Sequence, residues 1–183
     1  MESKMPKIFV IAGKARSGKD TVASIIKDKI TDKKVINLQY SFYIKEYAKK
    51  ISSWDGSEET KPRELLQIIG TDIIRNKIDK HFFIKKLIDD IKVYSYFFDV
   101  ITISDARYKD EIELIKESYS NTISIGVMRP NFDNGLTSDE KKHPTEIDLD
   151  DYDNYDYKII NDGNLLELEQ KVEKILEEVN LWI

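Results

Sequence analysis

A short apolar run followed by a glycine-containing loop constrains this chain more than any other segment. Residues 8–12 read Ile-Phe-Val-Ile-Ala, and residues 13–21 read Gly-Lys-Ala-Arg-Ser-Gly-Lys-Asp-Thr. The spacing G-x-x-x-x-G-K between a strand pattern and a helix pattern is that of a phosphate-binding loop. Its glycines allow a tight turn in which backbone amides point inward at an anion, and the next helix adds its positive end. We call residues 13–21 the phosphate loop, and we expect it to bind a nucleoside triphosphate.

Every residue of the phosphate loop is a candidate ligand of the nucleotide. The candidates are Gly13, Lys14, Ala15, Arg16, Ser17, Gly18, Lys19, Asp20 and Thr21. Lys19 can reach the outer phosphates. Asp20 stands where many such loops carry a magnesium-binding hydroxyl, and a carboxylate so close to phosphates needs a cation between them. We expect Asp20 to contact the metal or its water, and a helix cap is the alternative.

The composition is that of a soluble globular chain. Its 183 residues suffice for one domain with a sizeable core. No apolar stretch is long enough to span a membrane and no signal-peptide pattern is present, so we expect a cytoplasmic protein without a membrane partner. The absence of cysteine excludes disulfides and thiolate chemistry. A net charge of −5 argues against nucleic acid as a partner.

Arginine is scarce in this lysine-rich chain. The five arginines are Arg16, Arg63, Arg75, Arg107 and Arg129. A planar guanidinium matches phosphate oxygens in a way that an ammonium does not. Four of the five lie in segments that have other functional features, which favours phosphate contacts over a random scatter.

Strand and helix patterns alternate along the chain. Strand patterns cover residues 7–12, 35–38, 100–104, 122–128 and 157–160. Helix patterns cover residues 20–29, 41–51 with Ser41 as a cap, 62–74 with an apolar stripe (Leu65, Leu66, Ile69, Ile73 and Ile74), 82–91, 110–118 and 165–181. The alternation predicts an α/β fold of three layers, with a mainly parallel sheet between helices. Residues 129–156 lack an apolar period and predict a long excursion from the core.

Three of the expected strands end in polar residues. The first leads into the phosphate loop, the third into Asp105 and Arg107, and the fourth into Arg129. Ligands of open parallel sheets bind beyond the carboxyl ends of the strands. Asp105 is therefore a candidate to hold magnesium directly or through water, with a helix cap as the alternative. Arg107 is a candidate phosphate clamp.

Five segments together resemble a known family. They are residues 13–21, 66–75, 104–111, 143–146 and 160–163. In this order they resemble the deoxynucleoside monophosphate kinases found mainly in bacteriophages, and more distantly the animal phosphomevalonate kinases. The likeness extends from Lys7 to Val179 and is most specific in the phosphate loop and in the Asp-x-Arg segment at Asp105.

The resemblance implies one P-loop kinase domain over residues 1–183, with a helical substrate-binding region over about residues 41–95 and a lid over about residues 129–156. It implies an enzyme that uses ATP and Mg²⁺ to phosphorylate a nucleoside monophosphate. The implied catalytic residues are Lys19, Arg107 and Arg129, with Arg107 between the two phosphates and Arg129 at the start of the lid. Arg75 would grip the acceptor phosphate, Gln67 would contact its base, and Asn161 and Gly163 would flank adenine.

Other interpretations stay open at this point. The alternative for Gln67 is an ordinary exposed helix residue. The alternative for Arg75 is a residue that forms a surface salt bridge. The same fold could serve another acceptor, such as phosphomevalonate, dephospho-coenzyme A or a ribonucleotide. The chain could also belong to another functional class, a nucleotide-dependent switch that has no small acceptor. The guanine-selecting Asn-Lys-x-Asp motif of such switches is absent. The sequence leaves open the base, the sugar and whether the chain forms a homodimer.

Overall fold

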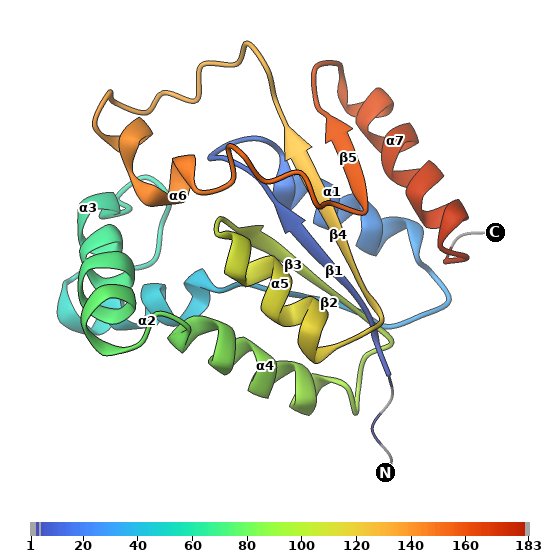
Figure 1. Cartoon of the computed structure of the whole chain (residues 1–183), viewed down its shortest axis with the longest axis horizontal. Coiled ribbons are helices and arrows are strands. Elements are labelled where there is room, and N and C mark those ends of the chain that lie inside the picture. Colours follow the sequence, from blue (N-terminus) through green and yellow to red (C-terminus); the bar gives the residue numbers. More distant parts are fainter. Residues whose placement is uncertain (1–2, 4, 182–183) are drawn as a thin grey trace.

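A five-stranded parallel sheet forms the centre of the structure, a computed structural model that describes residues 3 and 5–181. The strand order is β2-β3-β1-β4-β5, and every neighbouring pair is parallel. The strands are β1 (Lys7–Ala12), β2 (Val35–Leu38), β3 (Val100–Ala106), β4 (Thr122–Met128) and β5 (Tyr157–Ile160). Helices cover both faces (Figure 1), which confirms the expected α/β fold.

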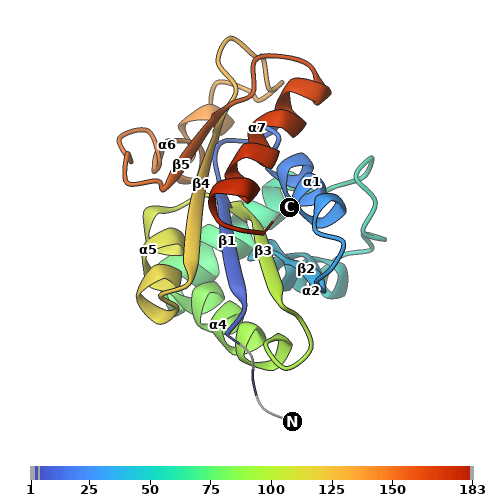
Figure 2. The ribbon, with the colours of Figure 1, turned by 90° about the vertical axis from the view of Figure 1, so that its right-hand side faces the viewer.

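The helices form the two outer layers and one flank. They are α1 (Lys19–Lys29), α2 (Ser41–Ile51), α3 (Arg63–Gln67), the π-helix η1 (Ile68–Ile78), α4 (Phe82–Tyr94), α5 (Lys109–Ser118), the 3₁₀ helix η2 (Glu140–Lys142), α6 (Pro144–Ile147) and α7 (Leu165–Glu178). Helices α1 and α7 pack together on one face of the sheet, whereas α4 and α5 cover the other (Figures 1 and 2). Across the part of the chain that the structure describes, no helix has the length and apolarity needed to cross a bilayer.

The central strand β1 is buried on both faces of the sheet. Ile8 and Val10 point toward the layer of α4 and α5, whereas Phe9 and Ile11 point toward α1 and α7. All four side chains are fully buried. A strand covered on both sides needs apolar residues at every position, which explains the unbroken apolar run that precedes the phosphate loop.

The helix formed by α3 and η1 departs from the predicted apolar stripe. Ile69 and Ile74 of this stripe are buried, but Ile73 is 41% exposed. The reason is the π-helical geometry of η1, whose hydrogen bonds span one more residue than those of an α-helix. Its wider turns bury Thr71 and Arg75 in place of Ile73.

The start of α2 also differs from the prediction. Ser41 is not the cap, because the N-cap position belongs to Tyr40, whose side chain makes no capping hydrogen bond. The backbone amides of Tyr40 and Ser41 each donate instead to a carboxylate oxygen of Asp105, at 2.9 Å in both cases. A carboxylate from the end of β3 therefore replaces a local cap.

Residues 129–156 form the expected excursion between β4 and β5. The segment contains the short helices η2 and α6, which the sequence analysis did not predict. Figure 1 shows it above the edge toward which β1 and β4 point.

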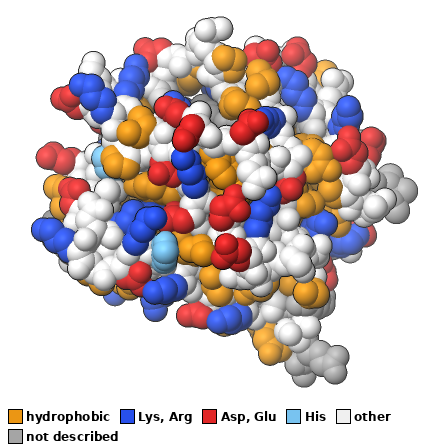
Figure 3. All heavy atoms as spheres, viewed as in Figure 1, with side chains coloured by type: hydrophobic (Ala, Val, Ile, Leu, Met, Phe, Trp, Pro, Cys, Tyr) orange, Lys and Arg blue, Asp and Glu red, His pale blue; other side chains and the backbone are white. Residues whose placement is uncertain are grey.

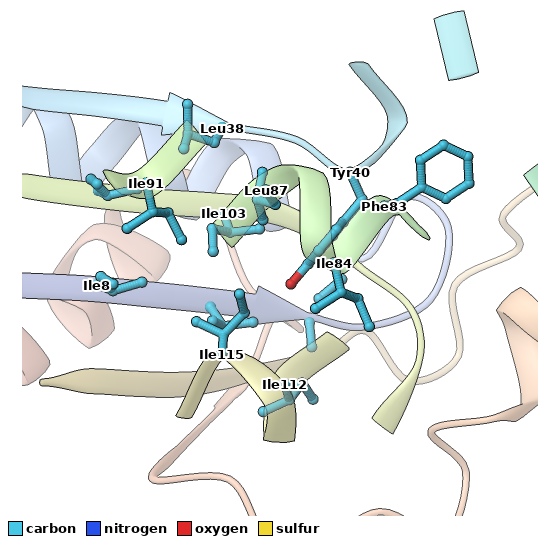
Figure 4. Packing of buried hydrophobic residues seen from close by; sticks show 14 of the residues in the cluster. Ile8, Leu38, Tyr40, Phe83, Ile84, Leu87, Ile91, Ile103, Ile112 and Ile115 are labelled. Atoms are coloured by element: carbon cyan, nitrogen blue, oxygen red, sulfur yellow. The ribbon is translucent and has the colours of Figure 1, made fainter. Parts of the chain in front are cut away.

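The packing of α5 predicts the effect of one core substitution. Ile112 and Ile115 of α5 belong to the same buried cluster as Ile8 of β1 (Figure 4), and Ile112 is fully buried. We expect Ile112→Ala to lower the free energy of unfolding by about 2–5 kcal/mol, because a buried cavity replaces the lost methylenes. Ile78→Ala is the matched control, since Ile78 is 65% exposed. Equal losses for both variants in urea unfolding would contradict this packing.

Candidate active site

The phosphate loop has the backbone of an anion cradle. Gly13 and Gly18 adopt φ angles of +150° and +106°, which favour glycine, and Arg16 adopts +58°. A Cβ atom at Gly13 would clash with the backbone carbonyl oxygen of Val127. The loop joins β1 to α1, so the expected strand–loop–helix arrangement is confirmed.

Lys19 lies buried at the first position of α1. Its side-chain Nζ donates a hydrogen bond to the carbonyl oxygen of Lys14 at 2.7 Å. Burial lowers the pKa of Lys19 to about 7, and repulsion by Arg107 adds to this effect, while the surrounding carboxylates oppose it. Because a bound anion would favour the charged ammonium, this site is suited to a phosphate group.

Asp20 presents an exposed carboxylate that the end of β3 holds in place. Its Oδ1 accepts hydrogen bonds from the Ser104 hydroxyl at 2.7 Å and from the Gln39 amide at 3.2 Å. Ser104 in turn accepts a hydrogen bond from Asn37 of β2 at 3.0 Å. Carboxylate and hydroxyl oxygens suit Mg²⁺, which keeps several waters. Among the described residues, no group of three or more acidic or histidine side chains could hold a metal alone.

Asp105 is a helix cap in this structure. Both of its oxygens accept amide hydrogen bonds at the start of α2, which is the alternative role considered for it from the sequence. A direct magnesium contact would have to share these oxygens. Magnesium binding by Asp105, directly or through water, stays a prediction.

Arg75 belongs to a buried charge cluster between η1 and α5. Its guanidinium donates to Glu111 at 2.8 Å and to Asp110 at 3.3 Å, and its Cζ lies 3.7 Å from the centre of the Tyr108 ring. Arg75 is only 8% exposed, so it is not a surface salt bridge. Burial raises the pKa of Glu111 to about 7, whereas the Arg75 charge and the backbone amide of Arg107 oppose that rise.

Glu146 of α6 lies against the phosphate loop, and the sequence analysis assigned it no role. Its Oε2 accepts a hydrogen bond from the backbone amide of Ala15 at 3.0 Å, and its Oε1 pairs with the Arg107 guanidinium. Glu146 is 7% exposed. The one sequence signal for it is its place in the fourth of the five family-like segments, residues 143–146.

Arg16, Asn161 and Arg129 each contact another segment or a neighbouring ring. The Arg16 guanidinium donates to the carbonyl oxygen of Asn134 at 2.7 Å, and the side-chain amide of Asn161 donates to the carbonyl oxygen of Ser17 at 2.9 Å. The guanidinium of Arg129 stacks over the Phe132 ring at 3.7 Å.

One cavity of about 540 Å³ brings most of these groups together. The predicted residues that line it are Ala15, Arg16, Gly18, Lys19, Asp20, Thr21, Gln67, Arg75, Asp105, Arg107 and Arg129. Gly13, Lys14 and Ser17 line a second cavity of about 430 Å³, whereas Asn161 and Gly163 line neither. Lys45, Lys61 and Arg63 also line the larger cavity and had no predicted role there.

The fold and the phosphate loop define a P-loop kinase. Similar solved structures include a sugar kinase from Janibacter (TM-score 0.61, 14% identity, 96% of this chain and 95% of that one). They also include the APS kinase of Mycobacterium tuberculosis with AMPPNP and APS (0.59, 14%, 95% and 99%) and the shikimate kinase of Aquifex aeolicus (0.53, 18%, 95% and 98%). These likenesses concern the fold.

A family model described as deoxynucleotide monophosphate kinase matches residues 31–172, and the chain belongs to that family. A putative deoxynucleotide monophosphate kinase of Acanthamoeba polyphaga mimivirus is 27% identical over 92% of this chain and 94% of its own length. The deoxynucleotide monophosphate kinases of Escherichia phage RB69 and Enterobacteria phage T4 are 33% and 29% identical over 62% and 87% of this chain. The matches span 44% and 56% of those two phage proteins. The phosphate loop lies outside the matched range and supports the assignment separately.

The buried charge cluster predicts the effect of removing one carboxylate. We expect Glu111→Gln to lower the free energy of unfolding by about 3 kcal/mol, because Arg75 would lose its closest anionic partner inside the protein. Glu117→Gln on the exposed face of the same helix is the matched control and should change it by less than about 0.5 kcal/mol. Urea unfolding at pH 8 measures both. A Glu111→Gln loss as small as the control's would argue against a buried Arg75–Glu111 pair.

Proposed function

We propose that this protein transfers the γ-phosphate of ATP to a deoxynucleoside monophosphate. An oxygen of the acceptor phosphate would form the new bond to the γ-phosphorus, and the bond from that phosphorus to the bridging oxygen of ADP would break. One observation carries the proposal: residues of the phosphate loop, with Lys19, line the same cavity as the buried Arg75. Both are groups suited to binding a phosphate. The family match supports a nucleotide as the acceptor.

On the donor side, the amides of the phosphate loop and Lys19 would hold the ATP phosphates. The loop already accepts an anion, since the Glu146 carboxylate binds the Ala15 amide. Asn161 holds the carbonyl oxygen of Ser17 and lies beside Gly18, which supports the proposal that Asn161 and Gly163 flank the adenine.

On the acceptor side, Arg75 would bind the monophosphate. A guanidinium has five N–H donors, so donors are left for a phosphate after the bonds to Glu111 and Asp110. Lys61 and Arg63 line the same cavity and add positive charge. Gln67 also lines it and is the proposed contact to the base.

Between the two sides, Arg107 and Arg129 would neutralise the charge that spreads over the transferred group. Mg²⁺, when bound, would shield the phosphates from Asp20, which is held in place by Ser104. No general base is required, because the acceptor phosphate is already an anion.

The proposed lid is the first half of the 129–156 excursion. Residues 148–156 are tied to α5, because Asp148 accepts the Lys109 amide at 2.8 Å and Lys116 pairs with Asp156 at 2.9 Å. Residues 129–142 reach the phosphate loop through the bond from Arg16 to the Asn134 carbonyl. We therefore propose that movement over the substrates is confined to residues 129–142.

The phage relatives support a location in a host cytoplasm, which is part of the proposal. Figure 3 shows acidic and basic side chains interspersed over one face of the molecule. That surface offers no large basic area on the face drawn, in keeping with a small-molecule substrate.

A direct assay of phosphoryl transfer tests the function. With labelled ATP and magnesium, we expect the label to pass to deoxynucleoside monophosphates in preference to ribonucleotides, phosphomevalonate or dephospho-coenzyme A. Lys19→Ala should abolish transfer, since the buried cation at the phosphates is lost. Lys27→Ala, on the exposed side of the same helix, is the control. ATP hydrolysis that ignores every acceptor would favour a nucleotide switch instead.

Substitutions on the acceptor side of the cavity should change the KM for the monophosphate and not the KM for ATP. Arg75→Ala is expected to raise the KM for the monophosphate about tenfold or more, with little change in the KM for ATP, because a charged hydrogen bond to the acceptor is lost. Lys80→Ala removes an exposed lysine that also pairs with Asp110 and is the matched control. Circular dichroism checks that both variants fold. An equal rise in the KM for ATP would place Arg75 outside the acceptor site.

A further inference from the structure

The carboxylate of Glu146 makes the contacts that a phosphoryl group would make in this site. One oxygen accepts a hydrogen bond from the Ala15 amide of the phosphate loop, and the other pairs with the Arg107 guanidinium. Loop amides and arginine forks are the two donors that bind phosphate in such proteins. The contact joins segments that are 131 residues apart in the sequence.

The segment that carries Glu146 has a local cap at its start and a bond to α5 at its end. At the start of α6, the His143 ring accepts a hydrogen bond from the Thr145 amide at 3.3 Å. Directly after α6, Asp148 accepts the Lys109 amide at 2.8 Å. The His143 bond lies within the segment, whereas the Asp148 bond ties the end of α6 to the first residue of α5. Glu146 is therefore presented to the loop beside a point of attachment that lies outside residues 129–142.

The charge of Glu146 balances two cations that lie close together. Arg107 lowers the pKa of Lys19, which shows that the two positive groups repel one another. Glu146 acts on the pKa of Lys19 in the opposite direction. Its carboxylate thus offsets part of the repulsion between Lys19 and Arg107.

We propose that Glu146 is a built-in stand-in for the phosphate of the nucleotide, and that ATP must displace it from Ala15 and Arg107. This inference rests on the proposed function. While Glu146 holds the two donors, they are withheld from ATP. The apparent dissociation constant for ATP is therefore the intrinsic one divided by the fraction of molecules in which the donors are free. The displaced carboxylate also stays near the outer phosphates and repels them.

Calorimetric titration with AMPPNP and magnesium tests the proposal. Glu146→Gln removes the charge with little change in shape, and Glu146→Ala removes the contacts altogether. Both variants should bind AMPPNP about fivefold more tightly than the wild type, or more, because no carboxylate competes for the amide and the guanidinium. Tripolyphosphate, which has no nucleoside, should show the same gain, since the competition concerns the phosphates alone.

Glu140→Gln is the matched control. Glu140 faces the same cavity but bonds within its own segment, to the Thr137 amide at 2.8 Å. The Glu140→Gln substitution removes the same charge as Glu146→Gln, but it leaves the hydrogen bonds of the phosphate loop and of Arg107 in place. A gain in affinity as large as that of Glu146→Gln would mean that general repulsion, and not the stand-in contact, explains the result.

A measurement on the wild type keeps the test decisive if a variant fails to fold. The ¹³C carboxyl resonance of Glu146 should shift when AMPPNP is added, because its hydrogen-bond partners change. An unmoved resonance, or variants that bind AMPPNP no more tightly than wild type, would overturn the proposal while leaving the proposed function intact. A wild type that does not bind AMPPNP at all would overturn the proposed function itself.

Discussion

The central position of β1 is the constraint on which the rest of the site depends. Because β1 lies between β3 and β4 in a parallel sheet, its following loop lies beside the ends of both neighbours. Asp105 and Arg107 extend from the end of β3, and Arg129 from the end of β4. Burial of β1 on both faces anchors the start of the phosphate loop in the core of the sheet.

Two arginines that line the cavity are each held by a carboxylate from another element. Arg75 of η1 pairs with Glu111 of α5, and Arg107 pairs with Glu146 of α6. A buried cation without a partner would be costly, and burial together with repulsion by Arg107 lowers the pKa of Lys19 to about 7. The carboxylates therefore both stabilise the fold and orient the arginines that would bind phosphate. The same pairs mean that an incoming phosphate must share or replace an internal anion.

Local patterns predicted most of the secondary structure but failed where the determinant is distant or irregular. The apolar stripe through Ile73 assumed a period of 3.6 residues, and the π-helical turns of η1 bury Arg75 and expose Ile73 instead. Ser41 has the residue type of a cap, yet the carboxylate of Asp105 takes that role from 64 residues away. The α6 carboxylate was missed for a related reason, since its partner in the phosphate loop is remote in sequence and its own segment has no apolar period.

The amino-acid sequence by itself determined the parallel α/β fold, the phosphate loop and the family likeness, because these depend on local periodicity and on fixed spacings of glycine and lysine. Only the tertiary structure decided which charges meet: Arg75 with Glu111, Asp20 with Ser104, and Glu146 with the Ala15 amide. Such pairs form where strands and helices that are distant in sequence end at the same edge of the sheet. Their geometry is a product of packing, which no local pattern encodes.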